Sequence, residues 1–81
     1  MDVIRNKVVG QRLEILRKRS HLTQCEVARR LGYTQSLVSK VESGERSVPL
    51  VELWPYARAL EISPYELARE IHDSLSDAGL E

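Results

Sequence analysis

The chain has 81 residues, of which 42% are hydrophobic and 30% charged, a balance typical of one small globular domain. A domain of this size buries roughly 60 to 65 per cent of its unfolded surface, so we expect a simple core and no second domain. No apolar stretch is long enough to cross a bilayer and no signal-peptide region stands near the start, which predicts a cytoplasmic protein. Cys25 has no partner for an internal disulfide, and His21 and His72 stand too far apart for a zinc site.

The formal net charge of zero conceals an uneven distribution of charge along the chain. Residues 1–46 contain ten Lys or Arg against five acids, whereas residues 47–81 contain two Arg against seven acids. The first part is therefore suited to face a polyanion, and the second part to another role such as self-association. The alternative is that these charges only decorate solvated helices.

Apolar residues recur at helical spacing, which predicts an all-α bundle of about five helices without a sheet. The core of this single domain is expected within about residues 6–75. The first helix is predicted over Asn6–Arg19. The second is predicted to begin at Thr23, whose hydroxyl forms a capping box with Glu26, and to end at Gly32.

The third and fourth helices follow in the middle of the chain. The third is predicted to be capped by Thr34 and to end near Gly44, where glycine readily takes the left-handed conformation. The fourth is predicted to have Pro49 in its first turn and to carry four apolar residues inward, namely Leu53, Tyr56, Ala57 and Leu60. Pro55 would lie inside this helix and remove an amide donor, so we predict a kink or break there.

The fifth helix is predicted to begin at Ser63 and Pro64, with Glu66 completing the start signal. Its apolar side offers more surface than packing against a small core requires. We therefore expect a contact with a second copy of the chain through Tyr65, Leu67, Ile71 and Leu75. The alternative is that this helix only closes the core of the monomer. Residues 76–81 have little to bury and are expected to be frayed.

The strongest functional signal lies in residues 24–43. Each of the two predicted helices there has an apolar stripe, so the helices must cross closely; the stripes are Val27 and Leu31 on one helix, Val38 and Val41 on the other. Ala28 is small enough to allow contact at the crossing, and Gly32 supplies the backbone freedom for a short turn. This pattern indicates a helix-turn-helix.

A polar sector faces away from the apolar stripe of the third predicted helix. At about 100° per residue it holds Gln35, Ser36, Ser39, Lys40 and Ser43. A plain helical hairpin explains the apolar stripe but not this sector, which is almost free of acids. Amide, hydroxyl and ammonium groups are suited to base edges and phosphates, so the sequence predicts contact with double-stranded DNA.

The segment LTQCEVARRLGYTQSLVSKVESGERSVP resembles the DNA-binding core of the phage repressor and Cro-like helix-turn-helix family, often called the XRE family. The resemblance covers roughly residues 9–68. It implies a lambda repressor-like DNA-binding domain, in which the third helix enters the major groove and the second lies across the DNA backbone. Family members usually pair as symmetric dimers, so the resemblance also implies a homodimer on a pseudo-palindromic site.

The resemblance further implies roles for individual residues. The positions that match base contacts are Gln35, Ser36, Ser39 and Lys40. The positions that match phosphate contacts are Gln24, Thr34, Ser43 and Arg46, and Gln24 would also brace the first residue of the third helix. Arg17 and Glu42 match a pair that forms a buried salt bridge in some members.

Three departures from the family pattern bear on these roles. Leu37 occupies a place that is often polar, and we expect it at the edge of the core. Pro55 has no counterpart in the common pattern. Glu45 adds an acid beside the expected path of the DNA phosphates, which should weaken non-specific affinity.

The function predicted from these features is sequence-specific, dimeric regulation of transcription by DNA binding. The alternative is a protein-interaction module, antitoxin-like or polymerase-binding, in which DNA contact is secondary. An enzyme is not expected, because no nucleophile stands with a base, and neither a metal set nor a phosphate-binding glycine loop is present in the sequence. Neither a cofactor nor a small-molecule substrate is therefore predicted.

Overall fold

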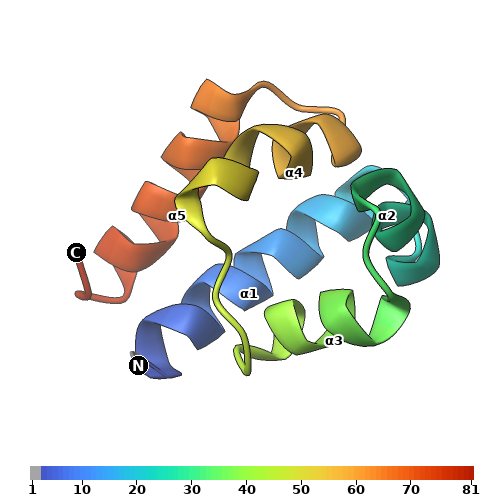
Figure 1. The fold of residues 1–81 in the computed structure, drawn as a ribbon. Helices are drawn as coiled ribbons and strands as arrows, with labels where there is room; N and C mark the ends of the chain where they lie inside the picture. Colours follow the sequence, from blue (N-terminus) through green and yellow to red (C-terminus); the bar gives the residue numbers. More distant parts are fainter. Residues whose placement is uncertain (1–2) are drawn as a thin grey trace.

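The computed structural model describes residues 3–81, and within them the chain forms five α-helices, one turn of 3-10 helix and no strand. The elements are α1 (Val3–Arg19), α2 (Gln24–Leu31), α3 (Gln35–Ser43), the 3-10 turn η1 (Leu50–Glu52), α4 (Leu53–Ala59) and α5 (Pro64–Asp77). α1 runs through the middle, α3 lies along one side of it, α4 and α5 lie on the other, and α2 lies at one end (Figure 1). The predicted all-α fold is confirmed.

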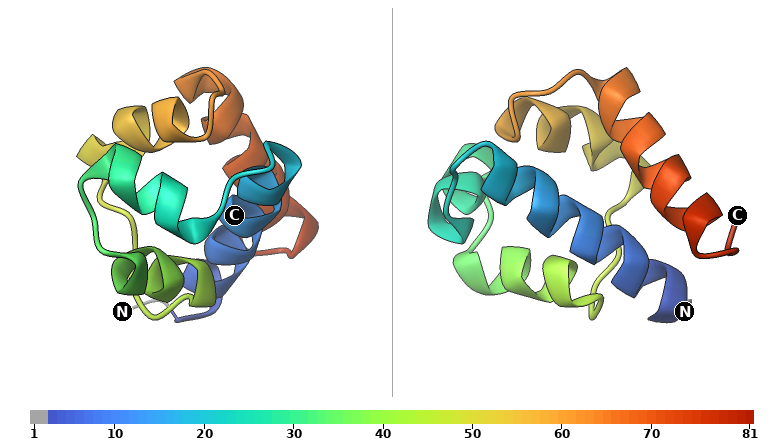
Figure 2. Two further views of the ribbon diagram at one scale, coloured as in Figure 1. Left: turned by 90° about the vertical axis from the view of Figure 1, so that its right-hand side faces the viewer. Right: turned by 180° about the vertical axis from the view of Figure 1, so that it is seen from behind.

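α1 is the element against which most of the others pack. It contacts α3 and α5, and it buries Leu13 and Leu16 in the core. The helix already includes Val3, so the predicted start at Asn6 is late. The first turn of α1 and the end of the chain lie side by side, where Arg5 Nε donates to the carbonyl of Leu80 at 2.7 Å (Figures 1 and 2).

The two helices of the helix-turn-helix begin at the predicted caps. Thr23 Oγ1 accepts from the amide of Glu26, and Glu26 Oε1 accepts from the amide of Thr23, which completes the capping box at the start of α2. Thr34 Oγ1 accepts from the amide of Leu37 at the start of α3. Gly32 ends α2 with φ of 73°, and Gly44 ends α3 with φ of 87°, both in the left-handed region where a side chain would be strained.

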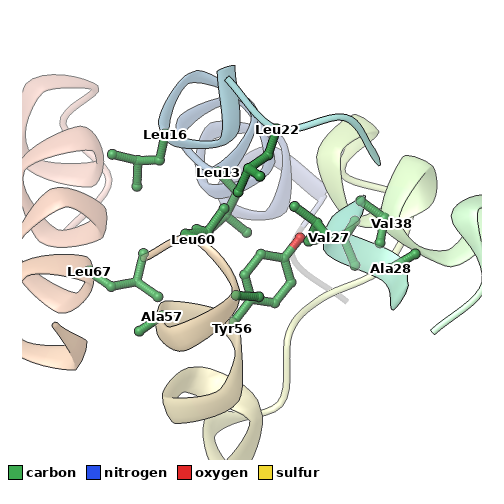
Figure 3. Packing of buried hydrophobic residues seen from close by; sticks show 12 residues of the cluster. Leu13, Leu16, Leu22, Val27, Ala28, Val38, Tyr56, Ala57, Leu60 and Leu67 are labelled. Carbon is green, nitrogen blue, oxygen red and sulfur yellow. The ribbon is translucent and has the colours of Figure 1, made fainter. Parts of the chain in front are cut away.

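Twelve buried hydrophobic residues join the helices into one cluster (Figure 3). Val27 and Ala28 of α2 meet Val38 of α3 at the crossing of the two helices, as the apolar stripes predict. Tyr56 reaches from α4 into the middle of the cluster, and its hydroxyl points toward Val27 (Figure 3). α3 is therefore fixed from behind by the core, and its other side remains available.

The fourth helix differs from the prediction. Pro49 precedes the 3-10 turn η1, and the α-helix proper begins only at Leu53. Pro55 is thus in the first turn of α4, where its missing amide would have had no partner within the helix. The helix continues through Pro55, so the predicted kink or break at that residue is wrong; the irregular segment is the turn Leu50–Glu52 just before the helix.

The fifth helix begins at the predicted cap, where Ser63 Oγ accepts from the amide of Glu66. The expectation of a frayed end is wrong, because Ser76 and Asp77 still belong to α5 and the chain then turns back at Gly79. In that turn the amide of Leu80 donates to the carbonyl of Leu75 at 2.8 Å. Backbone hydrogen bonds and the contact between Arg5 and Leu80 order this part of the chain.

Candidate nucleic-acid interface

The outer side of α3 is exposed along its whole length. The four side chains implied as base contacts, Gln35, Ser36, Ser39 and Lys40, are all exposed, while Val38 and Val41 on the inner side are buried. Among residues 3–81, no other helix covers this outer side in the views of Figures 1 and 2. Leu37 is half-buried, which agrees with the expectation of a place at the edge of the core. The structure therefore brings the four polar side chains onto one accessible surface, which we call the recognition face.

Arg17 and Glu42 form an ion pair behind the recognition face. Arg17 Nε lies 2.7 Å and Nη2 lies 3.1 Å from the two carboxylate oxygens of Glu42, and both residues are buried. Arg17 Nη1 donates to the carbonyl of Leu22 at 2.8 Å. The hydrogen bond that Arg17 donates to Glu42 raises the pKa of Arg17 further above its already high value, so the guanidinium stays charged. The pair predicted from the sequence is present, and it ties α1 to α3.

Gln24 links this ion pair to the recognition face. Its side-chain Nε2 donates to Glu42 Oε1 at 2.9 Å, and its Oε1 accepts from Gln35 Nε2 at 3.2 Å. Gln24 is half-buried, whereas Gln35 is exposed. The brace between Gln24 and Gln35 that the family resemblance implies is therefore in place. The contact between Gln24 and Glu42 was not predicted, because residues 18 positions apart give no local signal of their contact.

The loop after α3 offers few free hydrogen-bond donors. The amides of Glu45 and Arg46 both donate to the carbonyl of Lys40, so neither is directed outward. The hydroxyl of Ser43 lies 3.1 Å from the carbonyl oxygen of Lys40 and 3.0 Å from Glu45 Oε2. A hydroxyl has one proton to donate, so Glu45 competes with any phosphate for Ser43. Arg46 and Thr34 are exposed.

The apolar residues predicted to bind a second copy do not share one surface. Leu67 is 1% exposed and belongs to the core, so it is not available to a partner and that assignment is corrected. Tyr65 is 85% exposed, and Ile71 and Leu75 are half-buried. Exposed apolar residues that the sequence reasoning missed include Leu50, Val51 and Trp54 in η1 and the first turn of α4, exposed to 75%, 77% and 55%. They were missed because the sequence predicted one longer fourth helix over this segment. Val3, Ile4 and Ile15 of α1 are exposed as well.

Other candidate chemistry is limited within residues 3–81. Cys25 is an exposed free thiol on α2. In this part of the chain no three His, Cys, Asp or Glu side chains are grouped to hold a metal ion. A bilayer-spanning helix is likewise not found among the described residues.

The geometry defines a class of protein before any relative is considered. Two short helices cross at a glycine turn, the second exposes polar side chains, and three further helices support the pair. This is a helix-turn-helix DNA-binding domain.

Comparison with known proteins gives the family. The helix-turn-helix domain family matches residues 8–69 of the chain. An uncharacterized HTH-type transcriptional regulator of Sinorhizobium fredii, y4dJ, is 39% identical over 61 residues, which are 75% of this chain and 79% of that protein. The chain belongs to the helix-turn-helix family, as an XRE-like DNA-binding transcriptional regulator. Regulators of this kind are not usually enzymes.

Two solved structures have a similar fold. The restriction-modification controller protein C.AhdI from Aeromonas hydrophila is 42% identical, with a TM-score of 0.70 and coverage of 76% of this chain and 94% of that chain. An XRE-family like protein from Pseudomonas syringae is 33% identical, with a TM-score of 0.74 and coverage of 86% of this chain and 85% of that chain.

Proposed function

We propose that the protein is a sequence-specific regulator that binds a pseudo-palindromic operator as a symmetric dimer, with α3 of each copy in the major groove. The observation that carries the proposal is the recognition face of Gln35, Ser36, Ser39 and Lys40, held outward by a helix whose inner side is locked in the core. Because the helix is fixed, these side chains meet DNA in a defined arrangement. Such a regulator works in the cytoplasm, where bacterial DNA is found.

Phosphate contacts orient the domain on the duplex. We assign them to Gln24 and Thr34 at the starts of α2 and α3, and to Ser43 and Arg46 at the end of α3. The two groups of residues lie at opposite ends of α3, so together they hold the helix along the groove. The free amide hydrogen of Gln24 and the hydroxyl hydrogen of Thr34 are the donors available at the first end.

A dimer places two recognition helices about 34 Å apart, one turn of DNA. We place the contact surface at Leu50, Val51 and Trp54, which are apolar, exposed and close together in η1 and the first turn of α4. Leu50 also borders a crevice of about 210 Å³ that is lined by Leu53 of α4 and Ile71 of α5, among others. A second copy that buried these side chains would remove apolar surface from water, which is the usual source of dimer stability.

The test of DNA reading is a selection of bound sequences from random duplex DNA at two salt concentrations. We expect a two-fold symmetric site for the wild type, and only weak, salt-dependent binding without that site for Gln35→Ala. Gln11→Ala is the matched control, because Gln11 is an exposed glutamine on α1 that faces a crevice lined by Ser74 and Asp77 of α5 and not the recognition face. If no site emerges and all three proteins behave alike, the proposal is wrong.

The test of dimerisation is sedimentation of the wild type and of Trp54→Arg. Trp54→Arg should shift the protein toward the monomer and weaken operator binding, because a charge would be buried in the contact. Ile15→Arg is the control on α1, where the side chain is also exposed. The same apolar surface would suit the alternative function, a protein-interaction module. Normal self-association and operator binding by Trp54→Arg would favour that alternative for this surface.

A further inference from the structure

The hydrogen bonds that join Glu42, Gln24 and Gln35 each have one possible direction from donor to acceptor. The buried residue Glu42 sets that direction. Glu42 is paired with Arg17, so its carboxylate is charged and can only accept hydrogen bonds. The side chain of Gln24 has one end that donates and one that accepts. Only its Nε2 can face the carboxylate, and the observed contact is Nε2 to Glu42 Oε1 at 2.9 Å.

The orientation of the Gln24 amide in turn determines the orientation of the Gln35 amide. Because Nε2 of Gln24 faces Glu42, the acceptor Oε1 of Gln24 faces Gln35, and Gln35 must donate to it with its own Nε2. The opposite arrangement would set an amide oxygen against the carboxylate of Glu42, whose side chain is only 4% exposed, and two acceptors would then face each other away from water. One orientation of both amides therefore satisfies every contact.

The edge that Gln35 leaves free has one acceptor, Oε1, and one remaining N–H donor. In the major groove adenine presents a donor at N6 and an acceptor at N7, which is the complement of that edge. Guanine presents two acceptors, O6 and N7, and would need two donors from an amide that has already given one to Gln24.

We propose that Glu42 is a specificity-determining positioning residue, which acts through Gln24 to orient Gln35 so that α3 selects adenine over guanine at the base that Gln35 faces. Glu42 itself lies behind the recognition face, buried between α1 and α3. Its influence is on the direction of the hydrogen bonds and not on a direct contact with DNA. The inference rests on the proposed reading of DNA by the recognition face and names what one position of that face reads.

The experiment is a selection from random duplex DNA with four proteins: the wild type, Gln35→Ala, Glu42→Gln, and the exchange Gln24→Glu with Glu42→Gln. Gln35→Ala identifies the base that depends on Gln35, and we expect adenine there for the wild type. Glu42→Gln gives Gln24 a partner that can donate or accept, so the ratio of adenine to guanine should fall by about tenfold or more. The exchange keeps the net charge and again turns an acceptor-only group toward Gln35, so the preference for adenine should return.

A second variant keeps the buried ion pair intact and decides the question if Glu42→Gln does not fold. In Gln24→Lys an ammonium group donates to Glu42 and offers no acceptor to Gln35. Gln35 should then turn its Oε1 toward the ammonium and both N–H groups toward the base, which moves the preference to guanine. Gln11→Lys adds the same charge on α1 and should keep adenine. Circular dichroism and thermal unfolding verify that each variant is folded.

The outcomes separate the two proposals. The role of Glu42 is supported if the preference for adenine at the Gln35-dependent base is lost with Glu42→Gln and restored by the exchange. It is further supported if Gln24→Lys changes that preference to guanine. A wild-type site with a different base at that position, or with adenine retained by every folded variant, overturns that role and leaves the proposed function standing. If the wild type selects no site, both proposals are wrong.

Discussion

Arg17 and Glu42 meet inside the protein through two hydrogen bonds, from Nε to Oε2 at 2.7 Å and from Nη2 to Oε1 at 3.1 Å. Arg17 is on α1 and Glu42 is on α3, so the pair joins the central helix to the recognition helix. Both charges have been removed from water, and each depends on the other for compensation. The pair therefore affects stability strongly when it is broken from one side only.

Arg17→Met should lower the free energy of unfolding by about 3–5 kcal/mol, because it leaves a buried carboxylate without its counter-charge. The control is Lys18→Met on the same helix, where Lys18 Nζ lies 3.2 Å from Glu14 Oε2 at the surface. That exposed pair should contribute about 0–1 kcal/mol. Urea denaturation measures the free energy of unfolding of both variants. If both variants lost the same small amount of stability, the buried pair would contribute no more than the exposed pair.

Gly10 allows α1 to approach α3 closely. A Cβ at this position would lie 2.6 Å from the carbonyl oxygen of Glu42 and would also clash with that of Val41, and both are backbone atoms that cannot turn aside. Alanine stabilises an isolated helix by about 1 kcal/mol relative to glycine, so helix propensity alone predicts that Gly10→Ala is beneficial. We expect a loss of about 1–3 kcal/mol instead, because packing outweighs propensity.

Thermal and urea unfolding of Gly10→Ala measure this loss. The control is Gln11→Ala, the neighbouring and exposed position of α1, which should change stability little. A gain in stability for Gly10→Ala would mean that α1 and α3 are less closely packed than described.

The starts and ends of the helices could be predicted wherever a local signal exists. Thr23, Thr34 and Ser63 each accept a backbone hydrogen bond three residues ahead, as their sequence context indicates. Gly32 and Gly44 take positive φ at helix ends, which glycine does without strain. The helix-turn-helix and its exposed polar face follow from such signals combined with apolar periodicity.

The features that the sequence did not reveal depend on contacts between distant parts of the chain. The close approach at Gly10 requires knowledge of which backbone lies opposite, and the link from Gln24 to Glu42 joins two helices. Leu67 was assigned to a surface because an amphipathic helix gives no indication of whether its apolar side meets its own core or a partner. Pro55 was placed in the interior of a helix rather than in its first turn, because the 3-10 turn before α4 has no sequence mark.

Tyr56 is buried with its hydroxyl lacking a hydrogen-bond partner among the described residues. Removing that hydroxyl with Tyr56→Phe should leave stability unchanged at pH 7 or raise it by roughly 1 kcal/mol, because an unsatisfied buried group is unfavourable. A clear loss, measured by urea denaturation, would show that the hydroxyl has a bonding role.

The same residue should make stability depend on alkaline pH. Burial raises the pKa of Tyr56 well above its usual value, so the folded protein holds this proton after the unfolded chain has released it. The unfolded state then binds fewer protons, and stability should fall as pH rises above about 10, the ordinary pKa of tyrosine. The test compares the free energy of unfolding of the wild type with that of Tyr56→Phe at roughly pH 8 and pH 11, which lie on either side of the ordinary pKa of tyrosine. The additional loss at the higher pH should be absent from Tyr56→Phe.

Glu45 should restrain binding to every DNA sequence. Its carboxylate engages Ser43 and stands next to Arg46, at the end of α3 where we assign phosphate contacts. Glu45→Gln removes a charge that repels phosphate, so affinity should rise to a similar degree for operator and random duplexes. Arg46→Ala should lower affinity for both and reduce the slope of log affinity against log salt by about 1.

Fluorescence anisotropy over a range of salt concentrations measures these effects on both kinds of duplex. Asp77→Asn is the control, because it removes the same charge from the exposed end of α5. If Asp77→Asn raised affinity as much as Glu45→Gln, the effect would belong to net charge and not to the place where α3 ends. A change confined to the operator would instead assign Glu45 to base recognition, because phosphates carry no sequence information.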